Sequence, residues 1–227
     1  MRRFLLLTLL AVPAFAAAPT TPKYHLQLEA NGAAPFPYLA RFGTFNIDVY
    51  PGGVHVDTFW LNAFSRNDSN DLTVLNPLAR MYVDMPLHDI GSMLARLGAA
   101  GRKDASRSVP PLAAPLQGKV KDIVATRYRM TYGPEAWIDV WTTTAIPENP
   151  QLRRLMNEFV GAISPTTLAT VKTIPGTPLY VELNFSHYKK LPLLKLKSLT
   201  FDDAGESDAL SVGSLYVKAP LADAILK

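Results

Sequence analysis

Alternation of apolar and polar residues in short runs is the feature that most constrains the fold of this chain. In the segment LYVELNFS, residues 179–186, every second side chain is apolar, and Tyr, Glu, Asn and Ser occupy the positions between. A period of two residues predicts a β-strand with one buried face. Comparable runs cover residues 24–30, 42–50, 54–61, 72–75, 80–85, 122–132, 194–201 and 214–218. Most links between them are short, which favours antiparallel neighbours, so the sequence predicts a mainly β fold.

One strand breaks this rule because it is apolar on both faces. In WIDVWTT, residues 137–143, Trp137 and Trp141 share one face, while Ile138 and Val140 share the other. Something must therefore cover each side of this strand, since two bare tryptophans would form an adhesive patch. The sequence leaves open which face is turned toward the interior.

Two helices are expected among the strands. Asn149 is a good N-cap and Pro150 suits the first helical position, so a helix is predicted from Pro150 to about Val160. Its apolar stripe recurs at intervals of three and four residues, and it consists of Leu152, Leu155, Met156, Phe159, Val160 and Ile163. A shorter helix is predicted over residues 89–97. The longer helix is expected to bury its stripe against the preceding tryptophan strand.

The remaining organisation points to one domain. Residues 99–118 combine small residues, charges and prolines, which is typical of a flexible surface loop that links two groups of strands. A chain divided there into two domains is the alternative. We expect instead a single domain over residues 17–227.

The N-terminus predicts export. Arg2 and Arg3 precede an apolar run, and Ala14-Phe15-Ala16 has the small-x-small pattern of a signal-peptidase site. Residues 1–16 are therefore expected to be a cleaved signal peptide, and the mature protein to lie in the periplasm or cell envelope. The apolar run is too short for a bilayer, which takes about 20 residues, so no membrane-spanning segment is expected. The chain has no cysteine, which excludes a disulfide framework and a lipid-modified cysteine.

Charge gives no sign of a nucleic-acid partner. The formal net charge of +4 includes the two arginines of the signal peptide, and the other basic residues are scattered. A solvated surface explains these residues better than a phosphate-binding patch. We expect no nucleic-acid binding.

Recognisable catalytic or metal motifs are missing from the sequence. The four histidines have none of the spacings typical of zinc sites, and no nucleophile elbow, P-loop or dinucleotide motif is present. No metal, no cofactor and no enzymatic activity are therefore expected. Asp139, between the two tryptophans, could act as an acid, but pairing with Arg127 or Arg129 explains it better. A hydrolase with a dispersed site is the weaker alternative.

Three segments carry a resemblance to a known group of proteins. They follow the export signal and read NDLTVLNPLARMYVDMP, RYRMTYGPEAWIDVWTTTAIPENPQLRRLM and GTPLYVELNF. Their order resembles exported bacterial domains of unknown function related to the LolA, LolB and RseB half-barrels, with Tyr82 and Trp141-Thr142 at matching places. The resemblance implies a strongly curved antiparallel sheet with helices on its concave, apolar side. The lipoprotein carriers of that group hold acyl chains there, and the stress regulators sense lipoproteins.

Two functions are consistent with this layout. The first is an envelope protein that binds a lipid, an acyl chain or a lipoprotein in the concave cavity. The expected lining is the tryptophan strand, the main helix and the alternating strand, namely Trp137, Ile138, Val140, Trp141, Phe159, Leu179, Val181, Leu183 and Phe185. The second is an interaction or sensing module whose cavity is filled by its own side chains and whose partner is another envelope protein.

Overall fold

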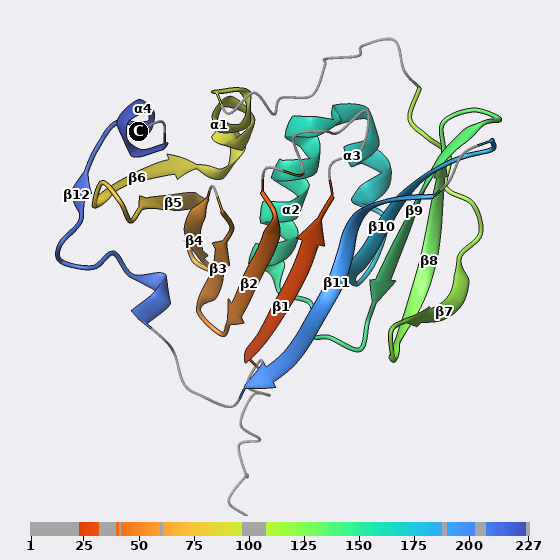
Figure 1. Ribbon diagram of the computed structural model, residues 1–227, viewed down its shortest axis with the longest axis horizontal. Coiled ribbons are helices and arrows are strands. Elements are labelled where there is room, and N and C mark those ends of the chain that lie inside the picture. The colour runs from red at the N-terminus through yellow and green to blue at the C-terminus, as the bar shows by residue number, and fades with distance from the viewer. Residues whose placement is uncertain are drawn as a thin grey trace, which may run out of the picture.

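The computed structural model describes residues 23–31, 40, 42–59, 61–96, 108–187, 190–202 and 208–225. The predicted signal peptide lies outside these residues. All described strands belong to one sheet, in the order β12-β6-β5-β4-β3-β2-β1-β11-β10-β9-β8-β7 (Figure 1). The sheet is not closed, because β12 and β7 stand at its two ends. The mainly β prediction is confirmed.

The strands follow the chain as β1 (Lys23–Ala30), β2 (Thr44–Tyr50), β3 (Gly53–Asp57), β4 (Asn62–Arg66), β5 (Asp71–Asn76), β6 (Met81–Pro86), β7 (Leu116–Val120), β8 (Ile123–Thr131), β9 (Ala136–Thr143), β10 (Thr177–Phe185), β11 (Leu191–Asp202) and β12 (Val217–Lys218). Every pair of neighbours is antiparallel except β12 and β6, which are parallel. The expectation from short links therefore holds for all strands but the last.

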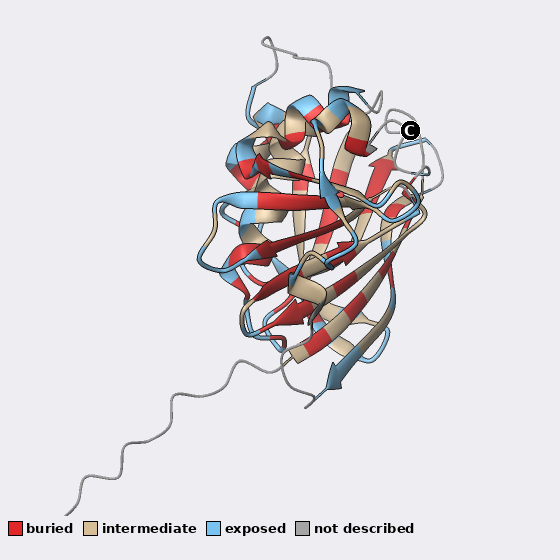
Figure 2. Ribbon diagram, turned by 90° about the vertical axis from the view of Figure 1, so that its left-hand side faces the viewer, coloured by how far each residue is buried: buried red, intermediate tan, exposed pale blue. Residues whose placement is uncertain are grey.

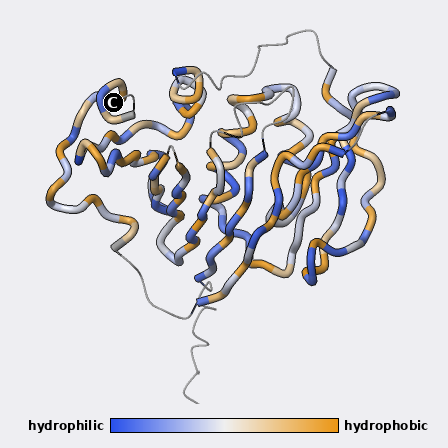
Figure 3. The backbone as a smooth tube through the Cα atoms, in the orientation of Figure 1, coloured by the Kyte–Doolittle hydropathy of each residue, from blue (hydrophilic) through white to orange (hydrophobic). Residues whose placement is uncertain are grey.

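Burial alternates along the strands as the sequence pattern requires. In β1, side chains alternate strictly between partly buried and buried, and Figure 2 shows the same banding on neighbouring strands. Figure 3 shows the matching alternation of hydropathy along the backbone. Two strands escaped the sequence pattern. The predicted strand over residues 54–61 ends at Asp57, where a turn leads into β4, and β7 occupies the end of the predicted loop at residues 99–118.

Helices cover one face of the sheet. α2 (Pro150–Ile163) and α3 (Pro165–Val171) lie behind the central strands in Figure 1, and α1 (Ile90–Arg96) lies beside α2. A short α4 (Leu221–Ile225) packs on β5 and β6. The described residues therefore hold four α-helices where two were predicted. α3 and α4 escaped prediction because each is too short for a full apolar stripe.

The N-terminus of α2 forms as its sequence dictates. The side-chain oxygen of Asn149 accepts hydrogen bonds from the backbone N–H groups of Gln151 and Leu152, each at 2.9 Å. Pro150 occupies the first turn, where an N–H has no helical partner. The helix then continues to Ile163, three residues beyond the predicted end.

The apolar core is divided into three clusters. One joins α1 and α4 to β4, β5 and β6. A second joins β1, β2 and β3 to Leu152 of α2 and to parts of β10 and β11. A third lies under α3, against β8, β9 and β10. Small domains usually have one contiguous core, so the space where three clusters meet is the natural place to look for a cavity.

Candidate functional site: an apolar cavity beneath α2

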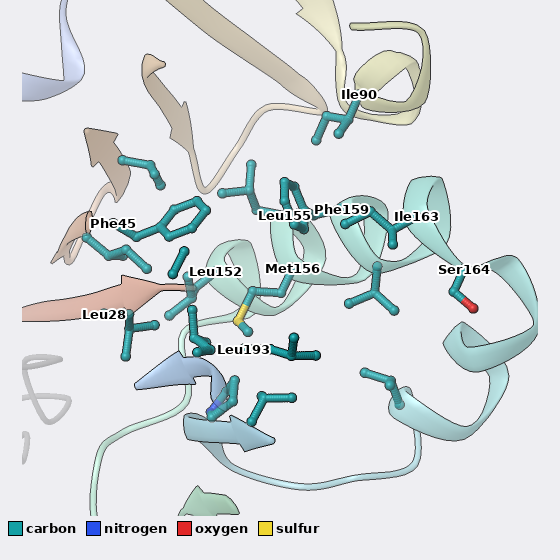
Figure 4. A pocket seen from close by; sticks show the side chains of 18 of the residues that line it. Leu28, Phe45, Ile90, Leu152, Leu155, Met156, Phe159, Ile163, Ser164 and Leu193 are labelled. Atoms are coloured by element: carbon teal, nitrogen blue, oxygen red, sulfur yellow. The ribbon is translucent and has the colours of Figure 1, made fainter. Parts of the chain in front are cut away.

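A cavity of about 270 Å³ lies between α2 and the helix-covered face of the sheet. α2 contributes its whole apolar stripe to the wall, namely Leu152, Leu155, Met156, Phe159, Val160 and Ile163. Figure 4 shows Leu155 and Phe159 on one side of this helix and Met156 on the other, and all three line the cavity. An apolar cavity of about 150 Å³ stays dry and takes benzene, so this larger space can hold a longer hydrocarbon group.

The α2 stripe is packed very unevenly. Leu152, in the first turn, is buried with only 3 % of its surface exposed. From Leu155 to Ile163, by contrast, every apolar side chain of the stripe stays only partly buried. Phe159 does have partners, since its ring lies 5.9 Å from that of Phe42 and 6.2 Å from that of Phe45, both edge to face. The exposed remainder of the stripe faces the cavity.

The tryptophan strand turns its aliphatic face inward. Ile138 and Val140 line the cavity, and so does Val181, which lies directly opposite Val140 on β10. The structure thus places four residues of the predicted lining around the cavity, namely Ile138, Val140, Phe159 and Val181. Of the two apolar faces of this strand, the face with Ile138 and Val140 is therefore the one turned toward the interior.

Trp137 and Trp141 lie on the opposite face of the sheet, away from the cavity. Trp141 is covered by Arg127, whose guanidinium lies 5.9 Å from the ring centre, and Arg129 covers Trp137 at 4.8 Å. Trp141 also reaches across β8 to β7, where a Cβ at Gly118 would lie only 2.7 Å from its ring. The prediction that Trp137 and Trp141 line the cavity is therefore wrong. Each ring is covered by an arginine instead, and Gly118 leaves room for the ring of Trp141.

Asp139 lies between these tryptophans and is paired with Arg129. Two parallel hydrogen bonds join the groups, Nε to Oδ1 at 2.7 Å and Nη2 to Oδ2 at 2.8 Å. The hydrogen bond to Asp139 raises the pKa of Arg129 above its ordinary value. The pairing predicted for Asp139 is confirmed, with Arg129 as the partner. This carboxylate is 2 % exposed and lies on the face away from the cavity.

A second carboxylate stands beside this pair. Glu182 lies directly opposite Asp139 on β10 and accepts a hydrogen bond from the Tyr180 hydroxyl at 3.0 Å. Burial, together with this hydrogen bond, raises the pKa of Tyr180 to about 12. Lys190 lies 3.8 Å from the same carboxylate. Asp139 and Glu182 thus each have a partner of their own.

Three other residues of the predicted lining lie near the cavity but not on it. Leu183 is buried in the cluster under α3, and Phe185 packs against that cluster. Leu179 is fully buried in the cluster around β1. The pairing of β10 with β9 shifts register between Pro178 and Tyr180, so Leu179 leaves the line of its alternating neighbours. An irregularity of this kind cannot be read from a simple period of two.

Much of the lining was not predicted. It includes Leu28 of β1, Phe45 of β2, Ile90 of α1 and Leu193 of β11 (Figure 4). Alternation placed Leu28 on an apolar strand face. No signal in the sequence placed that face against α2 rather than against other strands.

The cavity offers almost no polar chemistry. Its lining contains no charged residue, and its two hydroxyl residues, Ser164 and Thr167, hydrogen-bond to each other at 2.7 Å. Thr167 also bonds the Tyr132 hydroxyl at 2.7 Å. Within the described ranges, no three His, Cys, Asp or Glu side chains group as metal ligands. The cavity therefore suits an uncharged, hydrocarbon group.

The helices of the described residues are also too short or too polar for a bilayer. None of them contains an apolar stretch of the length that crosses a membrane.

Comparison with known proteins identifies no family. No protein-family model matches the chain, and no curated protein matches it. Among solved structures, an uncharacterized conserved protein from Thermus thermophilus is similar over 88 % of this chain and 91 % of its own, with a TM-score of 0.44 and 9 % sequence identity.

Proposed function

We propose that this protein binds a lipid or an acyl chain in the cavity beneath α2 and acts in the cell envelope. The observation that carries the proposal is the cavity itself, about 270 Å³ in volume and lined by apolar side chains. Ligand pockets are typically about 300–1,000 Å³, so this cavity is slightly smaller than that range. A single hydrocarbon chain, or part of one, is the ligand that fits it.

The half-barrel resemblance is consistent with this use. In that layout α2 lies on the concave side of a curved sheet, and the ligand occupies the space between helix and sheet. The predicted signal peptide, residues 1–16, supports an envelope location. A module with a filled cavity, which would work only through a protein partner, is less favoured because the α2 stripe leaves space unoccupied.

Hydrocarbon burial provides the driving force. Each methylene removed from water stabilises the complex by about 0.8 kcal/mol, so micromolar affinity takes on the order of ten methylenes before the costs of association. Acylated molecules such as fatty acids, phospholipids and lipoproteins carry chains of this kind. Their polar groups would remain outside, because no charged residue lines the cavity.

The test is direct binding. Protein exported from cells should carry lipid in native mass spectrometry, and delipidated protein should take up cis-parinaric acid, a fluorescent polyene fatty acid. Competition with unlabelled fatty acids, phospholipids and an acylated peptide would rank the ligands. Delipidated protein that responds to none of them would refute the proposal and favour the interaction module.

A further inference from the structure

The seam between α1 and α2 is apolar, whereas the two ends of α2 are held by hydrogen bonds. Both helices wall the same cavity, α1 through Ile90 and Met93 and α2 through Phe159 and Ile163. At the seam, Gly91 faces Ala162, and a Cβ built on Gly91 would lie 3.6 Å from that of Ala162. Two small residues thus meet at the seam, and the larger side chains around it, Leu155, Phe159 and Ile163, pack against the cluster that holds Ile90, Met93 and Leu94.

The first turn of α2 is held firmly by polar contacts. The Gln151 side chain is fully buried and donates to the Ser65 hydroxyl and to the Ser69 carbonyl. One turn on, Arg154 donates to the Asn70 side chain at 2.8 Å. These bonds fix the start of α2 to the turn between β4 and β5.

The far end of α2 is held through α3. Thr167 hydrogen-bonds the Tyr132 hydroxyl of the strand end at 2.7 Å, and Thr170 donates to the Pro110 carbonyl at 2.8 Å. α2 is therefore tied to the rest of the fold at both ends. Among the described residues, however, no hydrogen bond or ion pair joins α1 to α2.

We infer that the ligand reaches the cavity by separation of α1 from the C-terminal half of α2 at the Gly91–Ala162 seam. This inference rests on the proposed function and adds the route by which the ligand is admitted. Parting the seam breaks apolar contacts only, whereas displacing either end of α2 also breaks hydrogen bonds, and those that are buried are expensive to leave unmade. The partly exposed α2 stripe from Leu155 to Ile163 borders this route.

A reversible cross-link tests the route. The Cβ separation of 3.6 Å lies within the range of disulfides, about 3.5–4.5 Å, and the chain has no cysteine of its own to interfere. The Gly91→Cys/Ala162→Cys protein is compared in its oxidised and reduced forms, with each single variant under oxidising conditions as a control. Uptake of cis-parinaric acid is followed by stopped-flow fluorescence.

The reduced double variant should take up the probe at the wild-type rate, and the oxidised form should lose uptake. Protein loaded before oxidation should keep the probe through dilution, a result that misfolded protein cannot give. Equal uptake by oxidised and reduced forms would overturn the seam as the route and leave the proposed function standing. Failure of the wild-type protein to bind any probe would instead remove the function on which the inference rests.

A measurement on the wild-type protein covers the case in which the double variant does not fold. Hydrogen exchange should be faster in α1 than in the first turn of α2, and probe binding should slow it in α1. Exchange in α1 that is as slow as in that turn, and unchanged by the probe, would overturn the inference.

Discussion

Replacing Val181 by tryptophan tests whether the cavity is both empty and functional. Val181 lines the cavity, and its cross-strand neighbours Val140 and Leu194 line it as well. An indole is much larger than the isopropyl group that it replaces, so it should occupy a large part of the 270 Å³. The substitution should therefore exclude most of the ligand.

The magnitude follows from the displaced hydrocarbon. An indole takes the place of at least six or so methylenes, each worth about 0.8 kcal/mol, so the ligand should lose roughly 5 kcal/mol, a more than thousandfold loss of affinity. Stability should change by less than about 1 kcal/mol, because the new ring enters free space. In a well-packed core the same enlargement costs about 1–3 kcal/mol.

Leu183→Trp is the matched control. Leu183 lies two residues further on the same strand, on the same side, but it is buried in the cluster under α3 and does not line the cavity. Urea unfolding should show Leu183→Trp to be clearly less stable than Val181→Trp, and probe titration should show binding lost in Val181→Trp. Equal destabilisation by both, or wild-type binding by Val181→Trp, would refute the assignment of the cavity.

Three further predictions concern the remainder of the chain. Burial alone would raise the pKa of Asp84, but hydrogen bonds from Lys218 and Thr73 outweigh burial and lower that pKa. The ionised Asp84 therefore stabilises the fold above about pH 4, and this contribution to the free energy of unfolding is lost as pH falls further. Asp84→Asn should accordingly lower the melting temperature at pH 7 and should lose its effect in acid. Gly118→Val should destabilise the fold by about 1–3 kcal/mol in urea unfolding, because its side chain meets the Trp141 ring. Intact mass of exported protein should show cleavage after Ala16, and retention of residues 1–16 would contradict it.

The strands were predictable where one face is buried and the other is not. β1 could be predicted directly from alternation, because burial of one face imposes a period of two. β10 was also found by its alternation, although Glu182 and Asn184 on its polar face are buried. β4 and β7 did not, since NAFSR and LQGKV mix small and polar residues without a clean period. These strands are stabilised by pairing with neighbouring strands, and that pairing cannot be predicted from the residues of the strand alone.

The orientation of the tryptophan strand depended on residues elsewhere in the chain. Trp141 needs a shallow surface to lie on, and Gly118, which pairs with Ala125 across β7 and β8, provides it. Arg127 then covers the ring. Glycine and alanine at paired positions are the signal that could have settled the orientation, but the pairing of β7 with β8 had to be known first.

The cavity could not be predicted, because an apolar stripe indicates which side of a helix is buried but not how closely it packs. A void of about 270 Å³, if it were fully enclosed, would forgo stabilisation on the order of 6 kcal/mol at about 24 cal/mol per Å³. That is comparable to the whole stability of many domains, about 5–15 kcal/mol. α2 can stay above such a space because buried polar contacts at Gln151 and, through α3, at Thr167 hold its two ends, so the middle of the helix does not have to settle onto the sheet. A stripe that is apolar yet loosely packed, on a helix held by polar ends, is what the proposed binding function requires, because such a site gives up some stability to leave room for a ligand.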